Sequence, residues 1–144
     1  MRQHPLAAWC CVAVCLASLI GCGKANPRKE VTGMITLKGE PLDQGVIEFH
    51  PLGEGTKELP ATMEGAVIAK GEYKVPVEQG LVPGKYKVII TSGDGINPSN
   101  PDGMPEPSGN FVSKDRIPPA FNSESKVEVE VTSSGPNRFN FDVP

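Results

Sequence analysis

The sequence predicts an all-β domain folded as a seven-stranded antiparallel sandwich. Through most of the chain after residue 30, apolar residues alternate with polar ones at a period of two, the spacing of a strand with one buried face. No window keeps the 3.6-residue period of an amphipathic helix. The 15 prolines and 16 glycines are spread through the chain, which disfavours long helices and supplies turns between strands.

Seven stretches alternate in this way, and each presents one apolar face. Most of their apolar residues are β-branched or aromatic, types that pack well on a pleated, half-buried surface. Together they suffice for one small core, in agreement with the single domain expected for 144 residues. The residues expected to face the core are, in chain order, Val31, Gly33, Ile35 and Leu37; Ile47 and Phe49; Ala66 and Ile68; Tyr73, Val75 and Val77; Tyr86, Val88 and Ile90; Val127, Val129 and Val131; Phe139, Phe141 and Val143.

Turn residues stand between these stretches. Lys38-Gly39-Glu40-Pro41 ends the first strand, and Lys70-Gly71 is expected to join the third and fourth strands as a tight hairpin. Pro83-Gly84 leads into the fifth strand, and Gly135-Pro136-Asn137 separates the last two. The final strand, Arg138 to Val143, could add a partner's strand at a sheet edge, but we expect it to pair internally, with Pro144 blunting the edge.

Two longer stretches interrupt the strand pattern. Pro51 to Pro60 predicts a ten-residue loop, and residues 92–116 predict a longer one that is rich in Gly, Pro, Ser and Asn. Loops beyond about 15 residues are uncommon in compact domains and are usually functional or disordered. The second loop contains Ile96, Met104, Phe111 and Val112. It is therefore expected to be a disordered or solvated segment, to pack over one end of the sandwich, or to form a partner surface.

The first 21 residues predict a secretory signal peptide rather than part of the domain. Arg2 lies in a short polar start, and Leu6 to Ile20 is an uncharged run of 15 residues. A helix that spans a bilayer needs roughly 20 residues, so an uncleaved membrane helix is the weaker interpretation.

The end of this run, Leu19-Ile20-Gly21-Cys22, resembles the lipobox of bacterial lipoproteins. The resemblance implies cleavage between Gly21 and Cys22, diacylglycerol on the Cys22 sulfur and often acylation of the new amine. The single basic residue of the signal region departs from the usual pattern. Because two or more acyl chains hold a protein firmly on a bilayer, the domain is expected outside the cytoplasm, on the cell membrane or an outer membrane.

The cysteine count fits lipidation. Cys10, Cys11 and Cys15 lie in the segment to be removed, which leaves Cys22 as the sole cysteine of the mature chain. No internal disulfide can then form, and no cofactor or metal is expected. Residues 22–30 are expected to be the lipidated cysteine and a flexible tether, and residues 31–144 the domain.

The charge of the mature chain is mildly negative. Removing residues 1–21 takes away one cation, Arg2, and no acidic residue, so the formal net charge changes from −3 to −4. This argues against nucleic acid as a partner and against electrostatic docking on anionic lipid. The expected partners are the membrane, through the lipid on Cys22, and envelope proteins or polysaccharide.

Four motifs resemble the carboxypeptidase-regulatory-like group of transthyretin-like sandwiches. They are Val31-Thr32-Gly33, Gly39-Glu40-Pro41-Leu42, Gly71-Glu72-Tyr73 and Pro83-Gly84-Lys85-Tyr86-Lys87-Val88, and residues 117–143 look like the ending of small lipoproteins of this type from planctomycete-like bacteria. The resemblance implies a Greek-key sandwich, transthyretin-like or Ig-like, in a non-catalytic accessory domain. Its motifs are strand and turn signals, which specify fold rather than function.

The sequence offers few residues for catalytic chemistry. His50, the one histidine outside the signal region, is expected to be a surface residue at a strand end, and a single histidine builds no Ser-His-Asp or Cys-His arrangement easily. The hydroxyisourate hydrolases of the transthyretin-like fold need several histidines and a Tyr-Arg-Gly-Ser ending, which this chain lacks. Calcium binding by the long loop is disfavoured because prolines interrupt the spacing of its oxygen-bearing residues, Asp94, Asn97, Asn100 and Asp102.

The sequence therefore predicts a membrane-anchored envelope lipoprotein with a non-catalytic structural or binding domain. The alternative is an enzyme that acts on envelope polysaccharide or peptide through loop carboxylates. Glu128 and Glu130 share one strand face and, with Glu124, are expected to be solvated charge rather than a catalytic pair. Convergence of acidic side chains in a deep pocket would favour the enzyme. A ligand carrier would need an apolar cavity that so small a core cannot spare.

Overall fold

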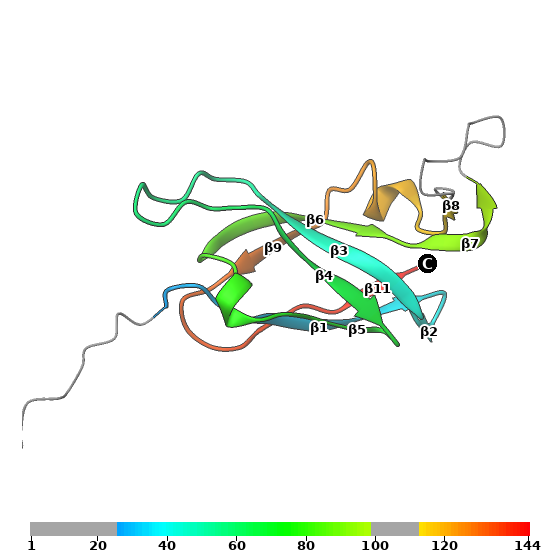
Figure 1. The fold of residues 1–144 in the computed structure, drawn as a ribbon, viewed down its shortest axis with the longest axis horizontal. Helices are drawn as coiled ribbons and strands as arrows, with labels where there is room; N and C mark the ends of the chain where they lie inside the picture. The colour runs from blue at the N-terminus through cyan, green and yellow to red at the C-terminus, as the bar shows by residue number, and fades with distance from the viewer. Residues whose placement is uncertain (1–25, 99–112) are drawn as a thin grey trace, which may run out of the picture.

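The computed structural model describes residues 26–98 and 113–144, which form an all-β domain (Figure 1). No helix among these residues is long and apolar enough to cross a membrane. The elements are β1 (Val31–Leu37), β2 (Glu40–Pro41), β3 (Gln44–Pro51), β4 (Glu64–Ala69), β5 (Glu72–Val75), the 3-10 helix η1 (Val77–Gln79), β6 (Gly84–Thr91), β7 (Gly93–Pro98), β8 (Ser113–Asp115), the 3-10 helix η2 (Pro119–Phe121), β9 (Glu128–Val131), β10 (Asn137–Arg138) and β11 (Phe141–Val143).

One curled sheet forms the body of the domain. Its strand order is β10-β1-β5-β4-β3-β6-β9, and β2 and β11 also pair with β1. The sheet bends between β4 and β5, which pair only at Ala69 and Glu72. As a result, β1 and β5 face β3 and β6 across the core (Figure 1). The predicted all-β class is confirmed.

The pairing is mainly antiparallel, but the C-terminal strands are an exception. Both β10 and β11 run parallel to β1. The curl brings the two sheet edges together, and the turn at residues 132–136 carries the chain from β9 on one edge to β10 on the other. Asn137 holds this turn, because its side chain accepts a hydrogen bond from the Thr132 amide at 2.8 Å. The last strand therefore pairs internally, as predicted.

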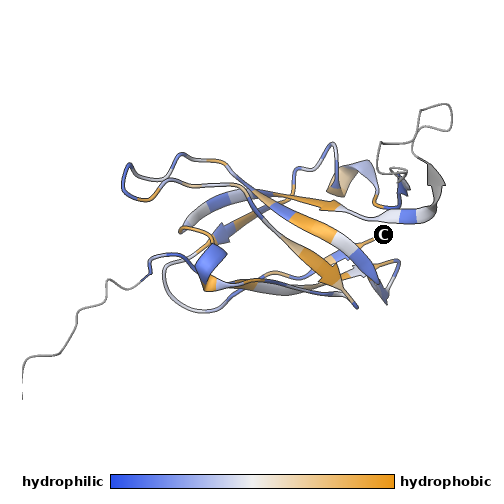
Figure 2. Cartoon of the chain, viewed as in Figure 1, coloured by the Kyte–Doolittle hydropathy of each residue, from blue (hydrophilic) through white to orange (hydrophobic). Residues whose placement is uncertain are grey.

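The core lies between the facing halves of the sheet, and its residues follow the predicted alternation. Figure 2 shows apolar and polar residues alternating along the strands. Val77 was expected to face the core but is 37 % exposed. Pro76 ends β5 there, since it has no N–H for the ladder, and Val77 starts η1. The buried apolar residues are Val31, Ile35, Leu42, Ile47, Phe49, Ile68, Tyr73, Val75, Leu81, Val82, Tyr86, Val88, Ile90, Ile117, Val131 and Val143.

Two Lys-Gly turns meet at one end of the sheet. Lys70 and Gly71 both have positive φ, 55° and 83°, as a two-residue type I′ hairpin requires. The predicted tight hairpin between β4 and β5 is thus confirmed. Lys38 and Gly39 adopt the same conformation between β1 and β2. The Gly71 amide donates to the Leu42 carbonyl at 2.7 Å. This hydrogen bond holds the β4–β5 turn against the chain that follows the β1–β2 turn.

The connections include one loop near its predicted position and one stretch with more structure than predicted. The first long loop connects β3 to β4 over residues 52–63 and carries an isolated bridge between Gly55 and Pro60. In the second stretch, β7 and β8 pair as a separate antiparallel ribbon, with Gly93 opposite Asp115 and Pro98 opposite Ser113. Met104, Phe111 and Val112 lie outside the described residues.

Candidate functional site

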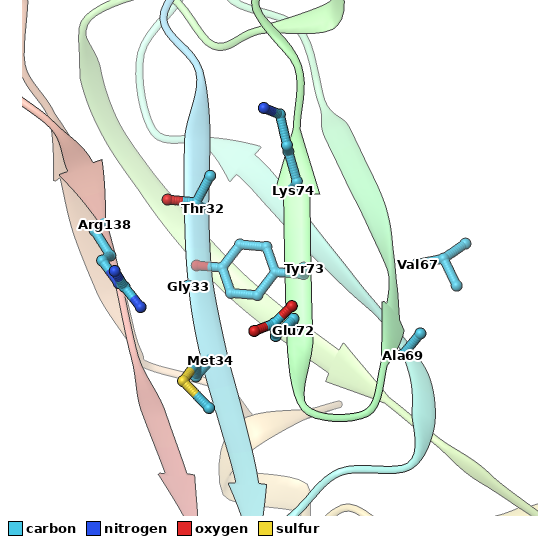
Figure 3. A pocket seen from close by; sticks show the side chains of 9 residues that line it. All are labelled: Thr32, Gly33, Met34, Val67, Ala69, Glu72, Tyr73, Lys74 and Arg138. Carbon is cyan, nitrogen blue, oxygen red and sulfur yellow. The ribbon is translucent and has the colours of Figure 1, made fainter.

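A shallow groove opens on the outer face of the sheet where β4 diverges from β5 (Figure 3). Its volume is about 500 Å³, and it is open to solvent. Figure 3 shows β1 and β5 between the β4 side chains on one side and Arg138 of β10 on the other. The lining residues are Thr32, Gly33, Met34, Val67, Ala69, Glu72, Tyr73, Lys74 and Arg138.

The floor of this groove is fixed by a close contact on its core side. Gly33 lies directly opposite Tyr73 in the β1–β5 ladder. The Tyr73 hydroxyl donates a hydrogen bond to the Phe139 carbonyl at 2.8 Å. A Cβ atom at Gly33 would lie 1.7 Å from that carbonyl oxygen, so only glycine fits. Burial raises the pKa of Tyr73, which keeps its hydroxyl a neutral donor.

The rim of the groove mixes apolar and charged side chains. Val67 is 73 % exposed and Met34 is 37 % exposed. Lys74, on β5, forms an ion pair with Glu30 at 2.7 Å. Because the groove is open, a small molecule there would keep much of its surface in water, unlike in an enclosed ligand pocket. The groove suits contact with another surface better than enclosure of a small ligand.

A polar network fastens the β7–β8 ribbon to β3. The Ser92 hydroxyl donates to the Gln44 carbonyl at 2.6 Å, and the Arg116 Nη2 contacts the Ser92 Oγ at 2.7 Å. The same Nη2 pairs with the Asp43 carboxylate at 2.5 Å. This hydrogen bond is the main reason why the pKa of Asp43 is lowered. The ribbon is thus tied to Asp43 and Gln44, which are 73 and 48 residues away in the sequence from their partners Arg116 and Ser92.

Asp115 completes the base of the ribbon. Its Oδ1 accepts hydrogen bonds from the Ser92 amide at 3.1 Å and the Ile117 amide at 2.8 Å. Its Oδ2 accepts one from the Asn122 side chain at 2.7 Å. One carboxylate at the end of β8 thereby joins the residue before β7, the segment that leads to η2 and the residue that follows η2. A second open groove of about 360 Å³ lies beside this base and shares Val67 with the first.

The predicted processing site lies outside the described residues. This applies to Gly21 and Cys22 alike. Of the residues weighed for calcium, Asn100 and Asp102 also lie outside them, and Asp94 belongs to β7.

The other residues considered for chemistry occupy surface positions. His50 is half-buried near the end of β3, and its Nε2 lies 2.9 Å from the Glu48 carboxylate. Glu128 and Glu130 are exposed on β9, opposite Lys87 and Lys85 of β6. This agrees with their interpretation as solvated charge on one strand face.

The charged network at the ribbon base was missed in the sequence. Arg116 and Asp43 are 73 residues apart and carry no local spacing signal. The polar composition of residues 92–116 suggested solvation, although Ser92 is 2 % exposed and Ile117, just beyond, is 5 % exposed. The available clue was the position of Ser92, which continues the alternation of the core-facing residues Tyr86, Val88 and Ile90.

Acidic side chains are dispersed over the described residues. Several of them contact neighbouring basic groups: Glu48 contacts His50, and Glu64 lies 3.8 Å from Arg28. Within residues 26–98 and 113–144, no three His, Cys, Asp or Glu side chains are grouped to hold a metal ion.

Neither a scan against models of protein families nor a search of curated proteins finds a match for this chain.

Proposed function

We propose that this protein is an exported lipoprotein, held on a membrane by lipid on Cys22, whose β-domain has a structural or binding role in the cell envelope. The observation that carries this proposal is the apolar run that ends in Leu19-Ile20-Gly21-Cys22, only four residues before the chain joins the folded domain at Asn26. We place the domain outside the cytoplasm. By resemblance to other bacterial lipoproteins, the Gly23 that follows the cysteine favours the outer membrane, where the cell has one.

Contacts near the start of the described chain support a short tether. Asn26 donates to the Val77 carbonyl at 3.1 Å, and Arg28 donates to the Gly80 carbonyl at 2.8 Å. Lys29 pairs with Leu81 in both directions, at 2.8 and 3.0 Å. We therefore propose that the free part of the predicted tether, 22–30, is residues 22–25, because Asn26, Arg28 and Lys29 contact the domain. Four Cα–Cα steps from Cys22 to Asn26 reach at most about 14 Å.

A binding role is favoured over catalysis by the arrangement of side chains. Both grooves are open to solvent. The first mixes valine, methionine and glycine with the charged residues Glu72, Lys74 and Arg138, whereas the second is lined by valine, glycine and uncharged polar residues. The acidic groups near them have structural contacts: Asp43 holds Arg116, and Asp115 holds three donors of the ribbon base. The alternative, an enzyme that acts on envelope polysaccharide or peptide, would need two of these carboxylates to leave their partners and converge.

The finer fold that we propose is a Greek-key sandwich of the transthyretin-like type. The curled sheet supports this, because its two halves face one another across a single core. The motifs behind the resemblance also fit together: Gly33 of the first motif is paired with Tyr73 of the third. In the fourth motif, the buried Tyr86 donates through its hydroxyl to the Val82 carbonyl at 2.9 Å.

Labelled palmitate tests the anchor. In a bacterial host, the wild-type chain should incorporate the label and sediment with membranes. Cys22→Ala should take up no label and should remain uncleaved or become soluble. Equal labelling and membrane retention of both proteins would contradict the proposal. Cys15→Ala is the matched control, because that cysteine lies in the segment to be removed.

A further inference from the structure

One end of the domain brings together the entry of the N-terminal chain and the longest described loop. We define this proximal end by residues 26–29, 52–63 and 76–83. The Arg28 guanidinium connects its parts, since it contacts the Thr62 hydroxyl at 3.4 Å and the Gly80 carbonyl at 2.8 Å. Figure 1 shows the chain entering here, with the C-terminus and the β7–β8 ribbon at the opposite end.

Three large apolar side chains are exposed at the proximal end. Leu52 is 51 % exposed, Met63 is 55 % exposed and Val77 is 37 % exposed. In the part of the chain that the structure describes, only Met34, Val46 and Val67 share this property, and they lie on the outer faces of strands. Single exposed apolar residues are ordinary on a protein surface. What distinguishes the three at the proximal end is their position beside the tether.

The tether restricts which surface can meet the bilayer. Asn26 can lie no more than about 14 Å from the Cys22 acylated at the lipid interface. The strands between the two ends are longer than that, since the eight residues of β6 extend over about 26 Å. The proximal end is therefore always near the lipid, whereas the ribbon reaches it only if the domain lies flat on a sheet face.

We propose that Leu52, Met63 and Val77 rest among the lipid headgroups, so that the domain stands end-on with its β7–β8 ribbon directed away from the membrane. This inference rests on the proposed anchor at Cys22. The contact is apolar, because the three cations of the proximal end, Arg28, Lys29 and Lys57, are balanced by three anions, Glu54, Glu58 and Glu78, so that this end has no net charge to attract anionic lipid. Added salt should leave the orientation unchanged.

Single introduced cysteines can test this orientation, because lipidated Cys22 would be the sole native cysteine of the mature chain. Leu52→Cys and Met63→Cys place a fluorophore at the proximal end, Val67→Cys on a sheet face and Lys38→Cys at the far turn. The lipidated full-length proteins are reconstituted in phosphatidylethanolamine–phosphatidylglycerol vesicles that contain a headgroup quencher. The two proximal labels should be quenched much more than the other two. Equal quenching at all four sites, or stronger quenching at Val67, would overturn the end-on orientation.

An unlabelled measurement gives a second readout on the native protein. Trypsin should cut after Lys57 more slowly on vesicles than in detergent, while the rate after Lys38 should change little. The double variant Leu52→Glu, Met63→Glu should lose this protection yet still float with the vesicles. Wild-type protein that floats but shows no protection at Lys57 refutes the orientation alone. Protein that does not float refutes the anchor itself.

Discussion

Gly33 and Tyr73 are cross-strand partners in β1 and β5, and the glycine leaves the space through which the tyrosine hydroxyl reaches the Phe139 carbonyl, 2.8 Å away. This contact joins β1, β5 and the chain between β10 and β11, which are distant from one another in the sequence. It also explains why the chain between β10 and β11 can cross so closely over β1, where the Phe139 amide donates to the Thr32 carbonyl at 2.9 Å. The contact leads to the first prediction.

Gly33→Ala should destabilise the domain by about 1–3 kcal/mol or more, because its Cβ meets a backbone carbonyl that cannot easily move. Gly53→Ala is the matched control, since a Cβ there meets nothing within 4 Å. Chemical denaturation of both variants checks the difference. Similar midpoints for the two variants would show that β1 and the crossing chain are not so closely packed.

Tyr73→Phe isolates the hydrogen bond from the packing. The ring is kept, but the Phe139 carbonyl loses its donor, at a cost of about 1–3 kcal/mol. Ser133→Ala is a suitable control, because it removes a hydroxyl from an exposed residue. Because burial raises the pKa of Tyr73, its ionisation should also be absent from an alkaline absorbance titration until the domain unfolds. Titration of Tyr73 in the folded protein at its ordinary pKa would contradict this placement.

The attachment of the ribbon should weaken in acid. Arg116 lowers the pKa of Asp43 below its ordinary value of 3.8, so the pair contributes stability above that pH and loses it as pH falls through the lower, folded value. A smaller amide protection factor at Arg116, whose N–H donates to the Ser92 carbonyl at 2.8 Å, should report the loss. Asp43→Asn should remove this pH dependence while the core amides, such as that of Val88, remain protected. A wild-type protection factor that does not vary in this range would exclude the mechanism.

Replacing residues 99–112 with a short Gly-Ser link should leave the melting temperature nearly unchanged. Pro98 lies opposite Ser113, so a short link can close the ribbon, and loop-closure entropy changes slowly with length. Replacing residues 92–116 should instead lower the melting temperature by several degrees, because it removes Ser92, Asp115 and Arg116 from their hydrogen bonds. The two melting curves test this directly. If they coincide, the network contributes nothing to stability.

The sequence predicted most of the strands because a half-buried strand alternates at a period of two over a few residues. The alternation identified Val31, Ile47, Tyr86 and Val131 as core residues, and all are nearly fully buried. Short-range turn chemistry likewise identified the Lys70-Gly71 hairpin.

Features that depend on distant parts of the chain were missed. The parallel pairing of β11 with β1 depends on the curl of the whole sheet. The ribbon base depends on Arg116 meeting Asp43 from 73 residues away. Val77 was misplaced because Pro76 ends the strand while the apolar pattern continues.

The most direct test of the central claim is the mass of the N-terminal peptide of the protein isolated from membranes. Digestion after Lys24 should release a peptide that begins at Cys22 and carries the mass of a diacylglycerol group, with or without a further acyl chain on its amine. A peptide that begins at Met1, or an unmodified Cys22 in the membrane-bound protein, would contradict the account.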